Sequence, residues 1–349
     1  MKTENTLPSW VIKTLCCPKT HEPLELRDTE LVSPSGRVYP IVNGIPVLLD
    51  DDSDPTLHVL SASYRRGQGD VSVIDQRAPD LYLESLGVSE SQKNDILRMR
   101  EDSRTIDPVI SMLLGATNGN GYLNLIGGES LPIPEWRMQN GNGQILLDIG
   151  CNWGRWCHAA RGAGWRVIGL DPSLGALSAA KRQAERMGIT DIVFICGDAR
   201  SLPFQNESLN AAHSYSVLQH FSFADATTAV QQVGRVLKTD GLSWIQMAHK
   251  VGVRSAYQLA RRGFSDGTGF DVRYWTQDQI ETVFNSAIGH SEFLVDCYFG
   301  LGLQWGDRHM MSGLSRIAVT VSEGLRRTSV QLPWLNKVAD SLFIESRKA

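Results

Sequence analysis

Three aspartates could do chemistry together, because each one ends a run of apolar residues that is typical of a buried strand. Asp148, Asp171 and Asp198 close the runs ILLD, VIGLD and FICGD. The carboxyl ends of parallel strands meet at one edge of a sheet, so we expect the three carboxylates to converge on one crevice. Asp171 lies 23 residues after Asp148, close to the spacing of about 20 at which a carboxylate meets ribose hydroxyls. A ligand with a cationic centre, a ribose and an exocyclic amine would suit them.

The residues after Asp148 predict a glycine-containing turn between a strand and a helix. Gly150, Asn152 and Gly154 follow in the pattern D-x-G-x-N-x-G. Glycine allows the backbone to approach a ligand closely, and nucleotide-type ligands bind at such turns. A D-x-G turn alone also occurs in unrelated α/β folds. The dinucleotide fingerprint G-x-G-x-x-G is not found at this turn, which disfavours an oxidoreductase that transfers hydride.

Five segments in order resemble the successive motifs of class I S-adenosylmethionine-dependent methyltransferases, of the type 11-like group. They are LDIGCNWG (147–154), GLDPS (169–173), GDARSLPF (197–204), VLQH (217–220) and RVLKTDG (235–241). The resemblance covers about half of the chain, and it implies a Rossmann-like, doubly wound α/β sheet with S-adenosyl-L-methionine as cofactor. Many relatives have glycine at the position of Asn152, whose short polar side chain tolerates the same unusual dihedrals.

The resemblance also implies roles for individual residues. The glycine turn would hold the methionine portion, and Asp148 would orient that turn or bind the amino group. Asp171 would bind the ribose hydroxyls, while Asp198 and the backbone at Ala199 would bind adenine. The implied cofactor-binding residues are Asp148, Gly150, Asn152, Gly154, Asp171, Pro172, Asp198, Ala199 and Ser214.

His220 and Tyr215 are the candidate catalytic residues. Methyl transfer from a sulfonium depends mainly on positioning, and a base is needed only if the acceptor must lose a proton. Tyr215 closes the fourth strand beside the expected sulfonium, and His220 follows where the cleft should be open. The alternative for His220 is a structural histidine at a helix start. No Pro-Pro-aromatic motif follows the fourth strand, which argues against methylation of nucleic-acid base amines.

Arg273, Tyr274 and Trp275 are the candidate acceptor-binding residues, because they follow the fifth strand, where the family usually places substrate contacts. Arginine can bind a phosphate or carboxylate through two parallel hydrogen bonds, and aromatic rings can stack on a sugar or ring face. The alternative is a solvated arginine beside two core aromatics.

Alternating strand and helix patterns support the α/β fold class. Strands are expected over 145–148, 166–171, 192–196, 210–214 and 243–248, with helices between them, and this alternation builds a parallel sheet covered on both faces. We expect three units: a small β-rich domain over 1–50, a linker and helical segment over 51–143 that packs on the catalytic domain, and the methyltransferase domain over 144–349.

The first fifty residues resemble the zinc-ribbon-like domain of the activator subunit of tRNA and protein methyltransferases. Relatives carry a C-P-x-C pair and a second cysteine pair that bind zinc. Here Cys17 and Pro18 are followed by Lys19 and Thr20, and Ser33 and Ser35 stand in place of the second pair. A structural zinc site needs four ligands in a tetrahedral array, so we expect a degenerate domain without metal.

Composition limits the remaining classes. The 349 residues carry 34 basic and 38 acidic side chains, a net charge of −4, which disfavours nucleic-acid partners. No stretch approaches the roughly 18 to 20 apolar residues of a membrane span. With Glu4 and Pro8 near the start, and six cysteines that form no C-x-x-C pair, we expect a cytoplasmic protein with reduced thiols.

The predicted activity is methyl transfer to a small molecule, a sugar or a glycan intermediate. The glycan expectation comes from residues 332–335 and 339–345, which resemble the closing segment of methyltransferase-like proteins found with glycan biosynthesis. Two alternatives stay open: an RNA methyltransferase, and a non-catalytic scaffold that binds the cofactor. The acceptor atom and the oligomeric state do not follow from the sequence.

Overall fold

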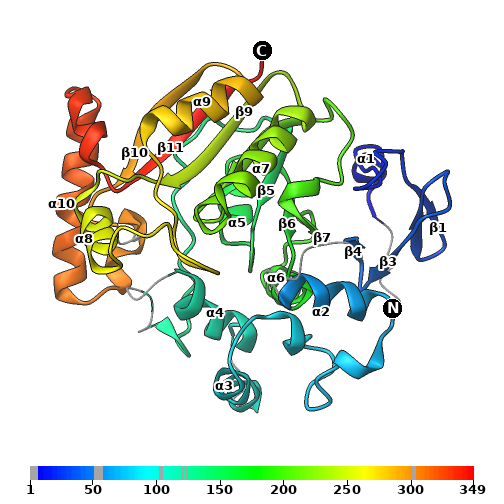
Figure 1. Ribbon diagram of the computed structural model, residues 1–349. Helices are drawn as coiled ribbons and strands as arrows, with labels where there is room; N and C mark the ends of the chain where they lie inside the picture. The colour runs from blue at the N-terminus through cyan, green and yellow to red at the C-terminus, as the bar shows by residue number, and fades with distance from the viewer. Residues whose placement is uncertain (1–6, 51–57, 102–104, 119–121, 123–124, 301–303) are drawn as a thin grey trace.

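One eleven-stranded sheet runs through the molecule in the order β1-β2-β3-β4-β7-β6-β5-β8-β9-β11-β10 (Figure 1). The computed structural model describes residues 7–50, 58–101, 105–118, 122, 125–300 and 304–349. The strands are β1 (Glu25–Arg27), β2 (Glu30–Val32), β3 (Val38–Val42), β4 (Ile45–Leu48), β5 (Ile145–Ile149), β6 (Arg166–Asp171), β7 (Val193–Gly197), β8 (Leu209–Ser214), β9 (Leu237–Ala248), β10 (Ser291–Cys297) and β11 (Ser341–Arg347).

The centre of the sheet is parallel, as the sequence predicts. Strands β7, β6, β5, β8 and β9 pair in parallel, and β11 pairs antiparallel with both β9 and β10. The strand order reverses on either side of β5, which is the switch point where ligands bind in doubly wound sheets. The Rossmann-like fold class is therefore confirmed.

Helices cover both faces of this sheet. Helices α5 (Arg155–Gly162) and α6 (Leu174–Arg186) bury their apolar sides with Leu146, Val167 and Phe194 on one face. Helices α7 (Phe223–Val236) and α9 (Gln277–Ala287) pack with Leu147, Ile168 and Ile195 on the other. Alternate residues of each strand thus enter different cores, which is why these strands read as continuous apolar runs.

Helix boundaries follow local capping. Ser173 caps α6 by accepting a hydrogen bond from the Ala176 amide, and Gly188 follows the helix with φ +70°, the residue types that favour these two positions. Ser222 caps α7, because its hydroxyl accepts a hydrogen bond from the Asp225 amide. The chain then passes directly from α7 into β9 at Leu237, which lies opposite Leu209 of β8.

The N-terminal β-unit is continuous with the main sheet. Helix α1 (Ser9–Ile12) precedes strands β1, β2 and β3, which pair antiparallel, and β3 turns into β4 through Asn43 and Gly44, both with positive φ. Strand β4 then lies parallel to β7, with Val47 opposite Cys196. The unit is therefore attached beside the strand that ends at Asp198, on the right of the molecule in Figure 1.

A helical layer connects this unit to the central sheet. It contains α2 (His58–Gly67), η1 (Val71–Val73), η2 (Leu83–Ser85), α3 (Glu90–Glu101) and α4 (Pro108–Asn118). Pro108 begins α4, in agreement with the predicted break, because proline suits the first turn of a helix. The layer packs on α6 through its own apolar cluster, which includes Leu83, Ile110 and Ala176.

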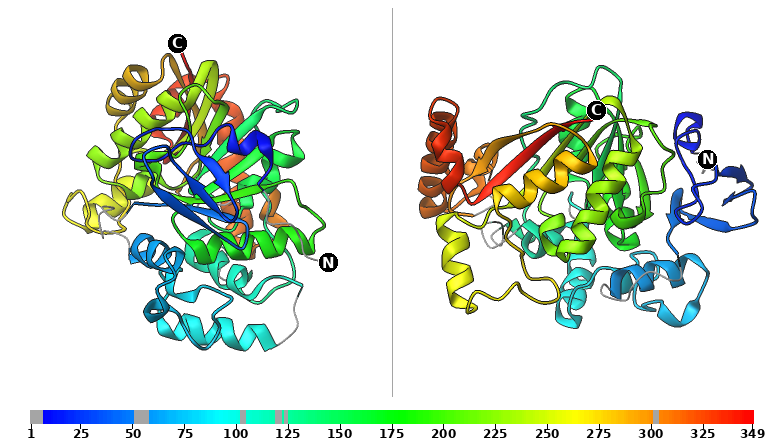
Figure 2. Two further views of the ribbon diagram at one scale, coloured as in Figure 1. Left: turned by 90° about the vertical axis from the view of Figure 1, so that its right-hand side faces the viewer. Right: turned by 45° about the horizontal axis from the view of Figure 1, so that its top comes forward.

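The C-terminal strands β10 and β11 are not among the predicted elements. A long insertion separates them and contains η6 (Trp305–Met310), α10 (Gly313–Ser329) and η7 (Pro333–Val338), while α8 (Val253–Arg261) follows β9. Figure 2 shows α8 and α10 on the side of the molecule away from the N-terminal unit. Within the described residues, no helix has the length and apolar character to cross a membrane.

Candidate cofactor and acceptor site

The turn after β5 has a backbone that few side chains allow. Gly150, Asn152 and Gly154 have φ values of +69°, +49° and +83°, in the left-handed region that glycine and asparagine tolerate. The Gly150 amide donates to the Leu170 carbonyl over 2.7 Å. A Cβ at Gly150 would lie 2.3 Å from Cγ2 of Val217. The turn is thus tightly enclosed, and Gly154 leads directly into α5.

Asp171 joins this turn to the end of β6. One carboxylate oxygen accepts the Asn152 amide over 2.9 Å, and the other accepts the Ser173 amide over 2.9 Å. The side chain is almost buried, and this burial raises the pKa of Asp171 to about 6. Each oxygen keeps a second lone pair, so the carboxylate can accept hydroxyl donors while it holds the turn.

Asp148 lies on the α5 face of the sheet and is fully buried. It contacts Nδ1 of His213 over 2.8 Å and accepts from the Cys157 thiol over 3.2 Å. Both partners are protein groups on β8 and α5. All six cysteines of the chain are buried.

Asp198 follows β7, the neighbour of β6, so its Cα lies at the same edge of the sheet as that of Asp171. Its carboxylate accepts the Arg200 amide and pairs with the Arg200 guanidinium over 2.7 Å. Asp198 caps the short η4 helix (Ala199–Ser201), in which Ala199 is buried. Pro172, after Asp171, accepts a hydrogen bond from the Cys196 thiol through its carbonyl.

Ser214 and Tyr215 end β8 beside the glycine turn. The Ser214 hydroxyl is buried and donates to the Ile149 carbonyl over 3.1 Å. The Tyr215 hydroxyl donates to Asp296 over 3.0 Å and accepts from Gln304 over 2.9 Å. Burial raises the pKa of Tyr215 well above its usual value, so its phenol stays protonated at neutral pH.

His220 ends the short η5 helix (Leu218–His220). Its Nδ1 lies 2.7 Å from the Phe270 carbonyl, and its ring stacks on the Phe270 ring at 4.7 Å. A carbonyl only accepts, so Nδ1 carries the proton. Nε2 keeps a lone pair and lies 3.5 Å from the side-chain amide nitrogen of Gln219. Burial also lowers the pKa of His220. The ring therefore has the tautomer and the charge of a general base.

The three predicted acceptor residues have different surroundings. The Arg273 guanidinium donates to the carbonyls of His220 and Gly269, and thereby holds the loop after α8 against η5. Tyr274 is half-buried beneath the Arg262 guanidinium, 5.1 Å from its ring centre. Trp275 is only 2% exposed and packs against Phe223 in the core, so its ring presents no face to an acceptor.

A buried charged cluster lies at the start of α5 and was not predicted. The Arg155 guanidinium donates to Asp307 over 2.7 Å and to the Tyr122 hydroxyl over 3.0 Å, and Tyr122 donates to Asp307. Arg155 directly follows Gly154, but its partner is 152 residues away. Only the position of Arg155 beside the glycine turn could have drawn attention to it.

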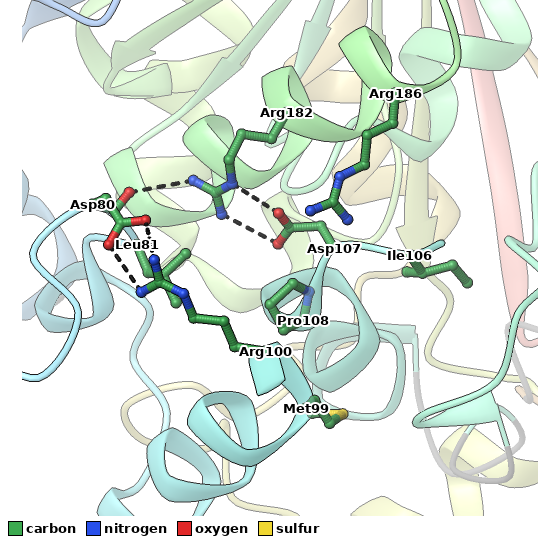
Figure 3. A pocket seen from close by; sticks show the side chains of 9 residues that line it. All are labelled: Asp80, Leu81, Met99, Arg100, Ile106, Asp107, Pro108, Arg182 and Arg186. Carbon is green, nitrogen blue, oxygen red and sulfur yellow. Dashed lines mark hydrogen bonds and ion pairs between the residues drawn. The ribbon is translucent and has the colours of Figure 1, made fainter. Parts of the chain in front are cut away.

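A cavity lies elsewhere, between α3, α4 and α6 (Figure 3). Most of its charges are paired: Arg182 binds Asp107 through two hydrogen bonds, and Arg100 binds Asp80 in the same way. None of the predicted site residues lines it. This cavity is therefore separate from the strand ends.

Part of the chain is similar to known methyltransferases. Residues 146–241 match a family described as a methyltransferase domain. The chain is 34% identical to an uncharacterized methyltransferase, YcgJ, of Bacillus subtilis, over 28% of this chain and 37% of that protein. It is 26% identical to a ubiquinone biosynthesis O-methyltransferase of Nitrobacter winogradskyi, over 47% and 63%, and 29% identical to a demethylmenaquinone methyltransferase of Oceanobacillus iheyensis, over 35% and 52%.

Solved structures resemble the fold at low sequence identity. YcgJ of Bacillus subtilis has a TM-score of 0.39 and 20% identity, over 60% of this chain and 93% of that chain. A Haloferax volcanii complex of the Trm112 methyltransferase activator with a putative methyltransferase gives 0.43 and 17%, over 61% and 85%. The alignments to the three relatives above span less than two thirds of each. The chain thus resembles a methyltransferase domain over residues 146–241, from β5 to the start of β9.

Proposed function

We propose that the protein transfers a methyl group from S-adenosyl-L-methionine to a small-molecule acceptor. The enclosed turn at Gly150, tied to the Asp171 carboxylate, carries this proposal. When bound, the cofactor supplies an electrophilic methyl group on a sulfonium. The Val217 side chain leaves no room for a Cβ at Gly150. The turn therefore keeps a glycine with positive φ, the kind of backbone that a nucleotide-type ligand can approach closely. Asp171 has free lone pairs for ribose hydroxyls.

The adenine and sulfonium contacts are proposed in the same way. Asp198, Ala199 and Pro172 stand at the ends of β6 and β7, where a base would lie beyond the ribose. Because Arg200 engages both oxygens of the Asp198 carboxylate, we assign adenine recognition there to the backbone at Ala199, with Asp198 holding the η4 turn in place. Ser214 and Tyr215 close the site at the end of β8.

His220 is the proposed general base for an acceptor that must lose a proton. Its Nε2 would take the proton while the Phe270 carbonyl holds Nδ1–H, and such proton transfer contributes about 10² to 10⁴ in rate. Tyr215 keeps its proton and donates a hydrogen bond. Arg273 holds the loop that carries Phe270, and Tyr274 offers a partly exposed ring, so we propose that they position His220 and the acceptor.

The proposed acceptor is a small molecule that carries a hydroxyl group. Sugars and glycan intermediates present hydroxyls, and the relatives include a ubiquinone biosynthesis O-methyltransferase and a demethylmenaquinone methyltransferase. A hydroxyl acceptor needs a base, whereas an activated ring carbon loses its proton after transfer. His220 suits a hydroxyl acceptor such as a sugar or a hydroquinol.

Calorimetry and a turnover assay test this function. We expect S-adenosylhomocysteine to bind one site per chain, and S-adenosylhomocysteine to form from the cofactor when the right member of a panel of sugars, lipid-linked sugars, hydroquinols and RNA is added. His220→Asn should lower kcat by about 10² or more with unchanged cofactor affinity, whereas His290→Asn, a surface change, should alter neither. Binding without turnover on any acceptor would indicate a scaffold, and turnover on RNA alone would indicate an RNA methyltransferase.

The N-terminal unit is proposed to act without zinc, as a docking or substrate-positioning element. Thr20 and Ser35 both donate to the same oxygen of Glu22, and Ser33 lies 2.9 Å from Ser35. The hydroxyls of Thr20, Ser33 and Ser35 thus stand at positions that the resemblance assigns to zinc ligands, and two of them bind the Glu22 carboxylate. Stoichiometric zinc in the purified protein, measured by elemental analysis, would contradict this proposal.

A further inference from the structure

Helix α10 carries an apolar stripe on its solvent side. Leu314, Ile317 and Val321 are between 47% and 83% exposed, and their spacing of three and four residues places them on one face. The opposite face is buried through Val319 and Ser322. A stripe of this kind on the outside of a folded chain marks an interaction site.

Helix α8 adds a second exposed apolar pair on the same side of the molecule. Val253 and Tyr257, four residues apart, are each more than half exposed. Both helices lie opposite the N-terminal unit in Figures 1 and 2. Trp334, in η7 after α10, is also mostly exposed. We call the exposed side chains of α8, α10 and η7 the α8–α10 surface.

The charge of this region is opposite to that of the whole chain. Residues 250–264 contain four basic and no acidic side chains, and residues 304–338 contain five basic and two acidic ones, in a chain with a net charge of −4. Both acidic side chains are buried in ion pairs: Asp307 with Arg155, and Glu323 with Arg326 and Arg327. The cations therefore dominate the surface.

We propose that the α8–α10 surface binds an anionic lipid membrane from one side, without crossing it. Exposed leucine, isoleucine and valine on amphipathic helices enter the acyl boundary, tryptophan and tyrosine prefer the headgroup level, and arginine and lysine pair with anionic lipids. The basic excess selects an anionic lipid surface over a neutral one. This inference does not depend on methyl transfer.

Vesicle flotation tests the proposal. The full chain should float with vesicles of 70% phosphatidylcholine and 30% phosphatidylglycerol. Its binding to vesicles of pure phosphatidylcholine should be weaker by roughly tenfold or more. L314S/I317S/V321S should weaken binding to the anionic vesicles by roughly tenfold or more. K250Q/R261Q, at two exposed cations, should weaken it by about fivefold for each charge, and salt should weaken it further.

A control variant replaces three exposed apolar side chains elsewhere on the molecule. V38S/V71S/M187S changes three exposed side chains outside the α8–α10 surface, and it should bind the vesicles as the unmodified protein does. Melting temperatures of all variants identify any that fail to fold. Three results would overturn the proposal: no binding by the unmodified protein, equal loss in the control variant, or a dimer that the L314S/I317S/V321S change dissociates while vesicle binding is missing.

Discussion

The glycine turn after β5 and the segment between β10 and β11 bury charged groups in different ways. At the turn, Asp171 is held by backbone amides and keeps lone pairs for a ligand. In the segment between β10 and β11, Asp307 forms an ion pair with Arg155, and Glu323 forms one with Arg326. Asp171 lies within the residues that match the methyltransferase family, whereas Asp307 and Glu323 lie beyond them. Asp171 thus keeps acceptor capacity, whereas the buried acids Asp307 and Glu323 are neutralised by arginines of the same chain.

The largest expected effect comes from breaking the buried ion pair between Arg155 and Asp307. Arg155→Met would leave Asp307 buried without its cation, which costs about 3 to 5 kcal/mol of the free energy of unfolding. Urea unfolding would measure it. Arg155→Met combined with Asp307→Leu should recover much of the loss, because the buried charge is then gone as well. A double variant no more stable than the single one would show that the pair does not act as a unit.

The next effect tests how tightly the turn is enclosed. Gly150→Ala should cost about 2 to 4 kcal/mol, since it adds a clash with Val217 to the strain of a positive φ. Gly143→Ala has a similar φ of +78° but meets no atom within 4 Å. It should cost only about 1 kcal/mol. Equal losses in the two variants, by thermal or urea unfolding, would mean that enclosure at Gly150 is not the cause.

Asp171 links cofactor affinity to pH. Asp171→Asn should weaken S-adenosylhomocysteine binding by about tenfold to a hundredfold, the value of a hydrogen bond to a charged group. Burial raises the pKa of Asp171 to about 6. The free protein therefore gains stability as pH falls through 6 toward 4, because the folded state binds the proton more tightly.

Cofactor affinity should change in the opposite sense. It should fall as pH drops below about 6, since the protonated carboxyl loses part of its acceptor capacity. Calorimetric titrations between pH 5 and 8 would check both directions, and Asp171→Asn should flatten the affinity profile. An unchanged profile in that variant would assign the pH dependence to another group.

The smallest effect concerns the N-terminal unit, where hydroxyls surround a carboxylate. Hydrogen bonds from Ser35 and Thr20 lower the pKa of Glu22. Ser35→Ala should move that pKa back toward the usual glutamate range, as measured by nuclear magnetic resonance titration, whereas Thr29→Ala should leave it in place. No shift in the Ser35 variant would mean that the hydroxyl network does not form.

The sequence predicts the central strands well because each combines an apolar run with a polar end. Strand β6 has the predicted ends, and the turn at Gly150 lies where the D-x-G pattern indicates. The strands β10 and β11 were not predicted, because a long insertion separates them along the chain. In the structure β11 pairs with β10 on one side and with β9 on the other. No local pattern encodes that pairing.

The candidate site shows the same division. Asp171 and Gly150 could be chosen from spacing alone, because their role depends on the strand and turn that contain them. The burial of Trp275 and the contact between Arg155 and Asp307 depend on segments distant in sequence. The roles of His220 and the other site residues stay predictions until the variants above are measured.

The position of β11 between β9 and β10 determines when this side of the sheet can form during synthesis. Because β10 touches the rest of the sheet only through β11, it stays unattached until residues 341–347 have left the ribosome. Until then, the long strand β9 presents an open hydrogen-bonding edge on which another chain could pair. A ribosome stalled between β10 and β11 therefore holds a nascent chain that is exposed to aggregation along β9.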